Sequence, residues 1–178
     1  MAQTEHDLDV IIESKVIANR VREMGNQITK DYEGKNLTVL IVLKGSFVFA
    51  ADLIRAIDLP LAVEFIGLQS YGDHRETSGV VQITLDTKHP LTGQDVLIVE
   101  DIVDTGLTVS YLMENLKTRR VNSIKLATLL HKPSRTEVKV PIHYLGFEIP
   151  DRFVVGYGLD DAGYMRNLPC IGALKDSE

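Results

Sequence analysis

Three carboxylates follow a run of four apolar residues in the segment VLIVEDIVDTGLT, residues 96–108. Glu100 and Asp101 come directly after this run, and Asp104 follows three residues later. Acidic side chains so close together repel one another and resist burial, so they need a cation or a ligand rich in hydroxyl groups. The segment therefore indicates a binding site at the end of an expected strand.

The residues after Asp104 form a candidate phosphate site. Thr105–Thr108 has the sequence Thr-Gly-Leu-Thr and leads into an expected helix, whose first N–H groups are unpaired and whose dipole favours an anion. A phosphorylated sugar would use both parts, with its hydroxyls on Glu100 and Asp101 and its phosphate on the loop. The alternative is that Thr108 only caps the helix and that the acids are solvated turn residues.

Buried strands and helices alternate along the chain around this segment. Continuous apolar runs are typical of strands that are covered on both faces, and apolar residues at helical spacing are typical of amphipathic helices. The expected strands are 37–43, 61–68, 80–85, 95–99, 123–130, HYLGFEI (143–149) and FVVGYGL (153–159). The expected helices run from Leu8 to about Lys30, over 47–57 and over 108–120. This order predicts an α/β fold with a mostly parallel central sheet, which binds its ligand at the carboxyl ends of the strands.

Basic residues follow two other strands that would end at the same edge. Lys44-Gly45 follows 37–43, where a cation and free amides suit a diphosphate, and Lys132 follows 123–130. Each of these residues taken alone is more often an ordinary turn or solvated loop residue. The polar stretch 70–79 fits a mobile hairpin loop. The sequence has no P-loop pattern and no histidines at metal-ligand spacing.

Composition narrows the class of protein. The chain has 178 residues, of which 44% are hydrophobic, so we expect one globular domain, residues 1–178. Its net charge of −6 argues against a general nucleic-acid or membrane-surface binder. Its one cysteine, Cys170, fits a reducing, cytoplasmic setting and is most simply a buried apolar residue. The acidic N-terminus does not match a secretory signal, and no run is apolar enough to suggest a membrane span.

Several segments also carry a resemblance to a known family. VLIVEDIVDTGLT resembles the phosphoribosyl-diphosphate-binding signature of type I phosphoribosyltransferases. Nearly the whole chain is similar to the hypoxanthine–guanine phosphoribosyltransferases, through VLKGSFVF, SYGD, the acidic segment, LLHKPSR, GFEIPDRFVVGYGLD and YMRNLP. One departure is Leu107, where the mammalian enzymes carry lysine; it should matter little if this position binds phosphate through its backbone.

The resemblance implies a fold and a reaction. The fold is the type I phosphoribosyltransferase fold, with a small hood region formed by the chain ends. The reaction is purine salvage, in which 5-phosphoribose moves from 5-phosphoribosyl 1-diphosphate to N9 of hypoxanthine or guanine and pyrophosphate leaves. The choice among hypoxanthine, guanine and xanthine stays open.

For the sugar and its phosphates, the resemblance implies distinct groups of residues. Lys44, Gly45 and Arg166 bind the diphosphate, through a loop that begins with a cis peptide between Leu43 and Lys44. Ser70 and Tyr71 close over the diphosphate as part of a lid. Glu100, Asp101 and Asp160 serve the ribose and a magnesium ion. The 5′-phosphate is bound by Asp104, Thr105, Gly106, Leu107 and Thr108.

For the purine, the resemblance implies that Lys132 donates a hydrogen bond to the 6-oxo group. Such a donor selects a 6-oxo base over a 6-amino base. Phe153 stacks on the base, although core packing is the default for any phenylalanine. Val154 reads the base edge through its backbone, near Asp160. Asp104 is the general base that takes the N7 proton as N9 attacks.

The implied cofactor is Mg²⁺, and the implied partners are the purine base, 5-phosphoribosyl 1-diphosphate and further copies of the chain in a homodimer or homotetramer. No nucleic acid or membrane partner is expected. Two other classes remain as alternatives: a response-regulator receiver, which also has strand-end acids and magnesium, and a nucleic-acid-binding regulator built on the same fold. A receiver lacks the Thr105–Thr108 type of loop after its acids, and the negative net charge disfavours the regulator.

Overall fold

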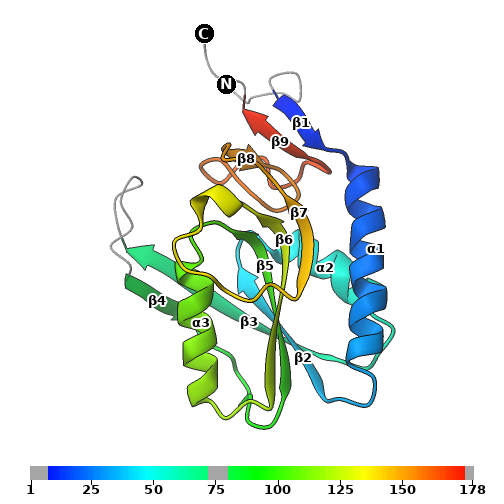
Figure 1. Ribbon diagram of the computed structural model, residues 1–178, viewed down its shortest axis with the longest axis vertical. Coiled ribbons are helices and arrows are strands. Elements are labelled where there is room, and N and C mark those ends of the chain that lie inside the picture. Colours follow the sequence, from blue (N-terminus) through cyan, green and yellow to red (C-terminus); the bar gives the residue numbers. More distant parts are fainter. Residues whose placement is uncertain (1–7, 72–79, 175–178) are drawn as a thin grey trace.

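The computed structural model describes residues 8–71 and 80–174. Within these residues a central sheet has six strands in the order β4-β3-β2-β5-β6-β7 (Figure 1). Its strands are β2 (Leu37–Leu43), β3 (Ala62–Tyr71), β4 (Val80–Leu85), β5 (Asp95–Val103), β6 (Ser123–His131) and β7 (Tyr144–Glu148). Neighbouring strands are parallel except β3 and β4, which are antiparallel.

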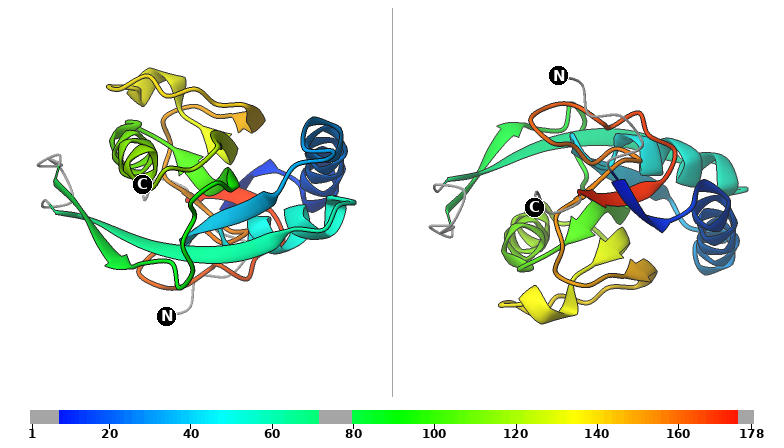
Figure 2. Two further views of the ribbon diagram at one scale, coloured as in Figure 1. Left: turned by 90° about the horizontal axis from the view of Figure 1, so that it is seen from below. Right: turned by 90° about the horizontal axis from the view of Figure 1, so that it is seen from above.

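The middle strands are apolar on both faces because helices cover both faces. Helices α1 (Ser14–Asp31) and α2 (Phe47–Ala56) lie on one side of the sheet and α3 (Leu107–Thr118) on the other (Figure 2). On β5, Leu97 and Val99 pack into the core beneath α1 and α2, whereas Val96 and Ile98 pack beneath α3. The α/β prediction is therefore confirmed.

A second, smaller sheet forms a hood beyond the carboxyl ends of the parallel strands (Figure 1). Its strands are β1 (Leu8–Ile12), β9 (Ile171–Leu174) and β8 (Val154–Val155), paired antiparallel in the order β1-β9-β8. Because β1 comes from one end of the chain and β8 and β9 from the other, the expected hood of chain ends is confirmed.

The single long helix expected from Leu8 to Lys30 is wrong at its start. Residues 8–12 form β1, and Glu13 has an extended backbone (φ −73°, ψ 151°) before α1 begins. The physical reason is a long-range pairing, since Leu8 lies opposite Leu174 and its side chain is buried there. A local helical spacing cannot reveal a strand partner at the far end of the chain.

Other elements also differ from expectation. The strand expected over FVVGYGL is reduced to Val154–Val155, because the backbone then turns through positive φ at Gly156, Tyr157 and Gly158. Strand β9 was not foreseen. β5 continues to Val103 instead of ending at Val99, so Glu100 and Asp101 lie within its last residues.

Membrane insertion through a helix finds no support in the described part of the chain, where no helix is long and apolar enough to cross a bilayer.

Candidate active site

The carboxyl ends of β2 and β5 meet at the centre of the sheet. The chain leaves β2 toward β3 and later returns to form β5 on the other side of β2, which makes these two ends the switch point at which open α/β sheets bind ligands. Gly45 packs directly against Asp101, since a Cβ on Gly45 would lie 1.4 Å from Asp101 Oδ2. The Leu43–Lys44 peptide is cis, as the family resemblance implied. The loop after β2 and the acidic end of β5 therefore form one corner.

The acidic pair in this corner is half-buried and only partly satisfied. Glu100 Oε2 is buried without a hydrogen-bond partner among the described residues. Burial raises the pKa of Glu100 well above its ordinary value, and the charge of Asp101 raises it further. Burial also raises the pKa of Asp101, although the Ile102 N–H donates to it at 2.7 Å. A buried acceptor without a partner is costly, so this pair suits a cation or hydroxyl ligand.

The donor set fits magnesium held jointly with a substrate. No group of three His, Cys, Asp or Glu side chains that could hold a metal occurs within residues 8–71 and 80–174. Mg²⁺ is usually bound by one or two carboxylates together with waters and phosphate oxygens, which matches Glu100 and Asp101. Asp160, also expected near the metal, instead pairs with Arg166 at 2.6 Å and accepts from the Gly163 N–H at 2.7 Å.

A cavity beside the corner brings together the two cations expected at the diphosphate. Its volume is about 490 Å³, and it is lined by Lys44, Arg166 and residues of β3 and β4. Arg166 is held by a hydrogen bond of 2.6 Å from Nη1 to the Gly158 carbonyl. The backbones of Ser70 and Tyr71 end β3 and pair with β4, whereas the rest of the expected lid, 72–79, lies outside the described residues.

The loop from Asp104 to Thr108 ends in a helix whose N-terminus is open. Gly106 is the N-cap of α3 with φ +84° and has no side chain to cap this end, while the Thr105 hydroxyl accepts from the Leu107 N–H at 3.4 Å. Thr108 lies inside the helix, so the reading of Thr108 as a simple cap is wrong. The Thr105 carbonyl accepts from the N–H groups of Glu137 and Val138 at 3.0 and 2.9 Å, which fixes the loop. Free amides at the start of α3 can therefore bind an anion.

The residues expected at the purine come from the end of β6 in the central sheet and from the start of β8 in the hood. Lys132 follows β6 and is only 9% exposed, so it is not a solvated loop residue. Phe153 is 58% exposed, so its ring does not pack in the core and is free to stack. Val154 is buried in β8, next to Phe153.

Two charged residues of this region were missed by sequence reasoning. Arg135 Nε lies 3.2 Å from Asp104 Oδ1, and Asp151 Oδ1 lies 3.5 Å from Lys132 Nζ. Both belong to segments that carried the family resemblance, LLHKPSR and GFEIPDRFVVGYGLD. That membership was the one signal available, because their proximity depends on how the strands are ordered.

Comparison with known proteins agrees with this arrangement. The family model described as "Phosphoribosyl transferase domain" matches residues 9–162. The hypoxanthine-guanine phosphoribosyltransferase of Dictyostelium discoideum is 49% identical over 172 residues, covering 94% of this chain and 96% of that protein. The hypoxanthine phosphoribosyltransferase of Haemophilus influenzae is 48% identical over 171 residues, covering 94% and 96%.

A solved structure agrees equally well in three dimensions. The crystal structure of a hypoxanthine phosphoribosyltransferase from Staphylococcus aureus superposes with a TM-score of 0.92 at 46% identity, covering 96% of this chain and 93% of that one. On its sequence, its fold and its site, the chain belongs to the phosphoribosyltransferase family, among the hypoxanthine(-guanine) phosphoribosyltransferases.

Proposed function

We propose that the chain transfers 5-phosphoribose from 5-phosphoribosyl 1-diphosphate to N9 of hypoxanthine or guanine, releasing pyrophosphate. The observation that carries this proposal is the Glu100 carboxylate beside Asp101, one oxygen of which is buried without a hydrogen-bond partner among the described residues. It lies between a cationic cavity and the N-terminus of α3. A phosphorylated sugar supplies hydroxyls for the acids and phosphates for the two flanking sites. Few other small molecules satisfy all three.

The leaving diphosphate would occupy the cavity between Lys44 and Arg166. Negative charge develops on it as the C1–O bond breaks, and preorganised cations stabilise that charge most effectively. Bound Mg²⁺ would supply further charge neutralisation, held by Glu100 and Asp101. Asp160 orients Arg166 through their ion pair and would contribute to holding the metal, directly or through water. Ser70 and Tyr71, at the end of β3, begin the lid.

The 5′-phosphate would lie on residues 104–108, on the backbone amides of Thr105, Gly106, Leu107 and Thr108. The purine would stack on the exposed ring of Phe153, beside the Val154 backbone and Asp160. Lys132 donates to the 6-oxo group, and its burial strengthens this selection because an unmatched 6-amino group could not be solvated there. Asp104 takes the N7 proton.

We further propose that residues 1–178 act as one cytoplasmic domain that assembles into a homodimer or homotetramer, without nucleic-acid or membrane partners. Exposed apolar side chains at Phe47, Phe65 and Leu85 offer surface for such self-association. Size-exclusion chromatography with light scattering measures the assembly, and a monomer at micromolar concentration would contradict it.

A spectrophotometric assay with 5-phosphoribosyl 1-diphosphate, Mg²⁺ and each of hypoxanthine, guanine and xanthine tests the function. We expect turnover with hypoxanthine or guanine and loss of turnover when the metal is chelated. Adenine is the matched control, because its 6-amino group meets the Lys132 donor, and we expect its kcat/KM to be lower by roughly 10³-fold or more. No turnover with any 6-oxopurine would overturn the proposal.

A further inference from the structure

Four charged side chains form a continuous row of ion pairs. The row runs between Lys132 and Asp104, the two groups that would touch the purine. Lys132 Nζ lies 3.5 Å from Asp151 Oδ1, and Arg135 Nε lies 3.9 Å from the same oxygen. Arg135 Nε also lies 3.2 Å from Asp104 Oδ1. One carboxylate oxygen of Asp151 is therefore shared by two cations, and Arg135 stands between two carboxylates.

The strand order brings these four side chains together. β6 and β7 are parallel neighbours, and the Ile149 N–H bonds to the His131 carbonyl where they end, so Lys132 and Asp151 leave the same edge side by side. Arg135 ends the short 3₁₀ turn Pro133–Arg135, and its N–H bonds to the Lys132 carbonyl at 3.0 Å. The N–H groups of Glu137 and Val138, which follow this turn, donate to the Thr105 carbonyl next to Asp104. The three segments are thus tied together by backbone hydrogen bonds.

The exposed fractions of these four side chains differ, and they favour an exchange of partners by Arg135. The Lys132 side chain is 11% exposed, whereas that of Arg135 is 48% exposed and those of Asp104 and Asp151 are 39% and 51% exposed. A half-exposed guanidinium stays solvated while it changes partners, so moving between two carboxylates costs little. Arg135 already lies within 4 Å of both.

The pairing of Arg135 with Asp104 opposes the reaction. Arg135 Nε donates to Asp104 Oδ1 at 3.2 Å, so the guanidinium competes with the N7–H group of the purine for this carboxylate. Asp104 must accept the N7 proton while the N9 lone pair bonds to C1 and the C1–O electrons leave with pyrophosphate. Arg135 therefore has to leave Asp104 before that step.

We propose that Arg135 and Asp151 are positioning residues that couple purine binding to the release of Asp104. Lys132 leaves Asp151 for the 6-oxo group, Asp151 then takes Arg135, and Asp104 is freed for the N7 proton. This inference rests on the proposed function, because Lys132 and Asp104 act in it as described above.

The test compares Asp151→Asn, Arg135→Gln and the double variant by steady-state kinetics with hypoxanthine. Asp151→Asn should lower kcat about tenfold with little change in the KM for hypoxanthine, because Arg135 then has no second partner. Arg135→Gln should lower kcat about threefold through loss of orientation of Asp104. The double variant should return to the Arg135→Gln value, so removal of Arg135 rescues the loss of Asp151.

Lys139→Gln is the matched control, because it removes an exposed cation from the same segment, and it should keep the parent kinetics. Additive losses in the double variant, or a raised KM with unchanged kcat in Asp151→Asn, would overturn the coupling and leave a structural role. Asp104→Asn, measured in parallel, separates the two proposals: if it stays fully active, the assignment of the general base fails; if it loses kcat while the double variant is additive, only the coupling fails.

Discussion

At the scale of single residues, desolvation of the Glu100 carboxylate lowers the free energy of unfolding when this side chain is charged. Its folded pKa is raised, so the folded state binds more protons than the unfolded state as the pH rises above the ordinary value of 4.5. The stability that its protonated form contributes is fully present below that value and is lost as the pH rises toward the folded pKa. At neutral pH, a ligand-free protein therefore holds a poorly solvated acid.

Glu100→Gln should stabilise the ligand-free protein at pH 8, because the amide is neutral and nearly the same size. We expect a gain of about 1–3 kcal/mol, seen as a Tm higher by about 3–8 °C in calorimetry and a smaller gain at pH 5. Binding of 5-phosphoribosyl 1-diphosphate with Mg²⁺ should weaken. Glu114→Gln, on the exposed face of α3, is the control and should shift Tm little. A lower Tm for Glu100→Gln at pH 8 would show that the buried carboxylate is satisfied.

Asp104→Asn tests the general base directly. The amide keeps the shape of the side chain but cannot accept the N7 proton, so kcat should fall by about 10²–10⁴ while substrate binding stays comparatively intact. Steady-state kinetics gives both constants, and circular dichroism checks the fold. Equal kcat values for variant and parent would remove the assignment.

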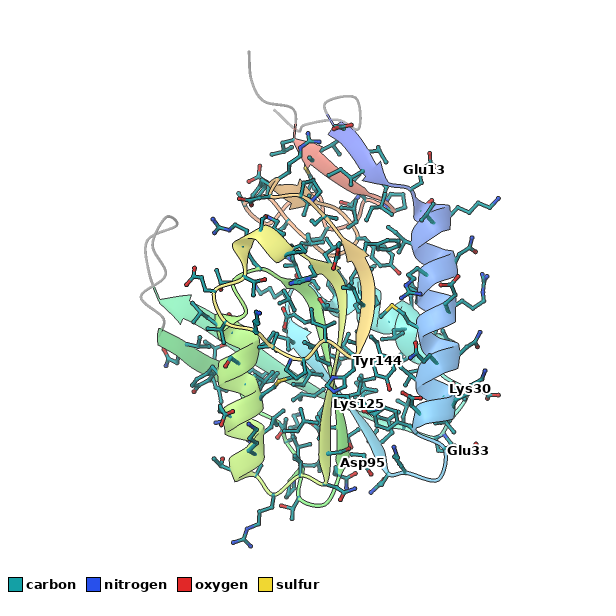
Figure 3. All side chains as sticks on the ribbon, in the orientation of Figure 1. Glu13, Lys30, Glu33, Asp95, Lys125 and Tyr144 are labelled. Atoms are coloured by element: carbon teal, nitrogen blue, oxygen red, sulfur yellow. The ribbon has the colours of Figure 1, made fainter. Side chains whose placement is uncertain are left out.

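At the scale of elements, the C-terminal end of α1 is bonded to the sheet near the starts of β6 and β7. These starts lie at the end of the sheet opposite the candidate active site. Asp31 Oδ2 accepts from the Tyr144 hydroxyl at 2.6 Å and pairs with Lys125 Nζ at 3.0 Å. The ammonium also lies 5.4 Å from the ring centroids of Tyr32 and Tyr144. Figure 3 shows Lys125 and Tyr144 toward the end of the molecule where β5 starts at Asp95. This cluster joins α1, β6 and β7.

Asp31→Asn should lower the free energy of unfolding in a pH-dependent way, because it weakens the contact between α1 and the sheet. The hydrogen bond from Tyr144 and then the Lys125 ammonium lower the pKa of Asp31, so its contribution is present above the ordinary value of 3.8 and is lost as the pH falls through the lower folded pKa. Because the carboxylate is about one-third exposed, we expect a loss of only roughly 1 kcal/mol at pH 7. Urea denaturation at pH 7 and at pH 3 measures it, and the difference from the parent should shrink at pH 3. Glu33→Gln, at an exposed acid two residues away, is the control and should change the free energy of unfolding little.

A strand could be predicted from the sequence when its signal lay within its own residues, and not when it depended on a distant partner strand. The strands near 37–43, 95–99 and 123–130 were predictable because both of their faces are buried, which leaves continuous apolar runs. Strands β1 and β9 were not, because β1 pairs only with β9, and β9 pairs with β1 and β8, which are distant in the sequence. The exposure of Phe153 was also hidden, since its apolar neighbours Val154 and Val155 are the same whether the ring points inward or outward.

At the scale of the whole molecule, the hood and the core meet where two glycines approach. A Cβ on Gly158, whose φ is +107°, would lie 2.1 Å from the Gly45 carbonyl oxygen. Nearby, the Tyr157 hydroxyl donates to Asp52 of α2. Because the Gly158 carbonyl also holds Arg166, this junction sets the distance between the two cations of the cavity.

Gly158→Ala should therefore damage stability and diphosphate binding together. The added methyl group meets backbone, and its conformation is strained as well, so we expect a loss of about 3 kcal/mol or more and a Tm lower by about 6–12 °C. The KM for 5-phosphoribosyl 1-diphosphate should rise by about tenfold or more. Gly34→Ala is the control, because it has φ +74° with nothing within 4 Å of the added Cβ, and it should lose only the backbone strain. Equal effects of the two variants would show that the junction has no special role.

The antiparallel pairing of β1 with β9 has a consequence for protein engineering. Leu8 and Leu174 are directly opposite one another, so a peptide could join the two ends across the hood. New termini could then be opened at the Gly93 turn, where an added side chain would meet open space at the far edge of the sheet. Such a circular permutant would keep every strand neighbour while moving a fused tag or reporter from the hood to the opposite end of the central sheet.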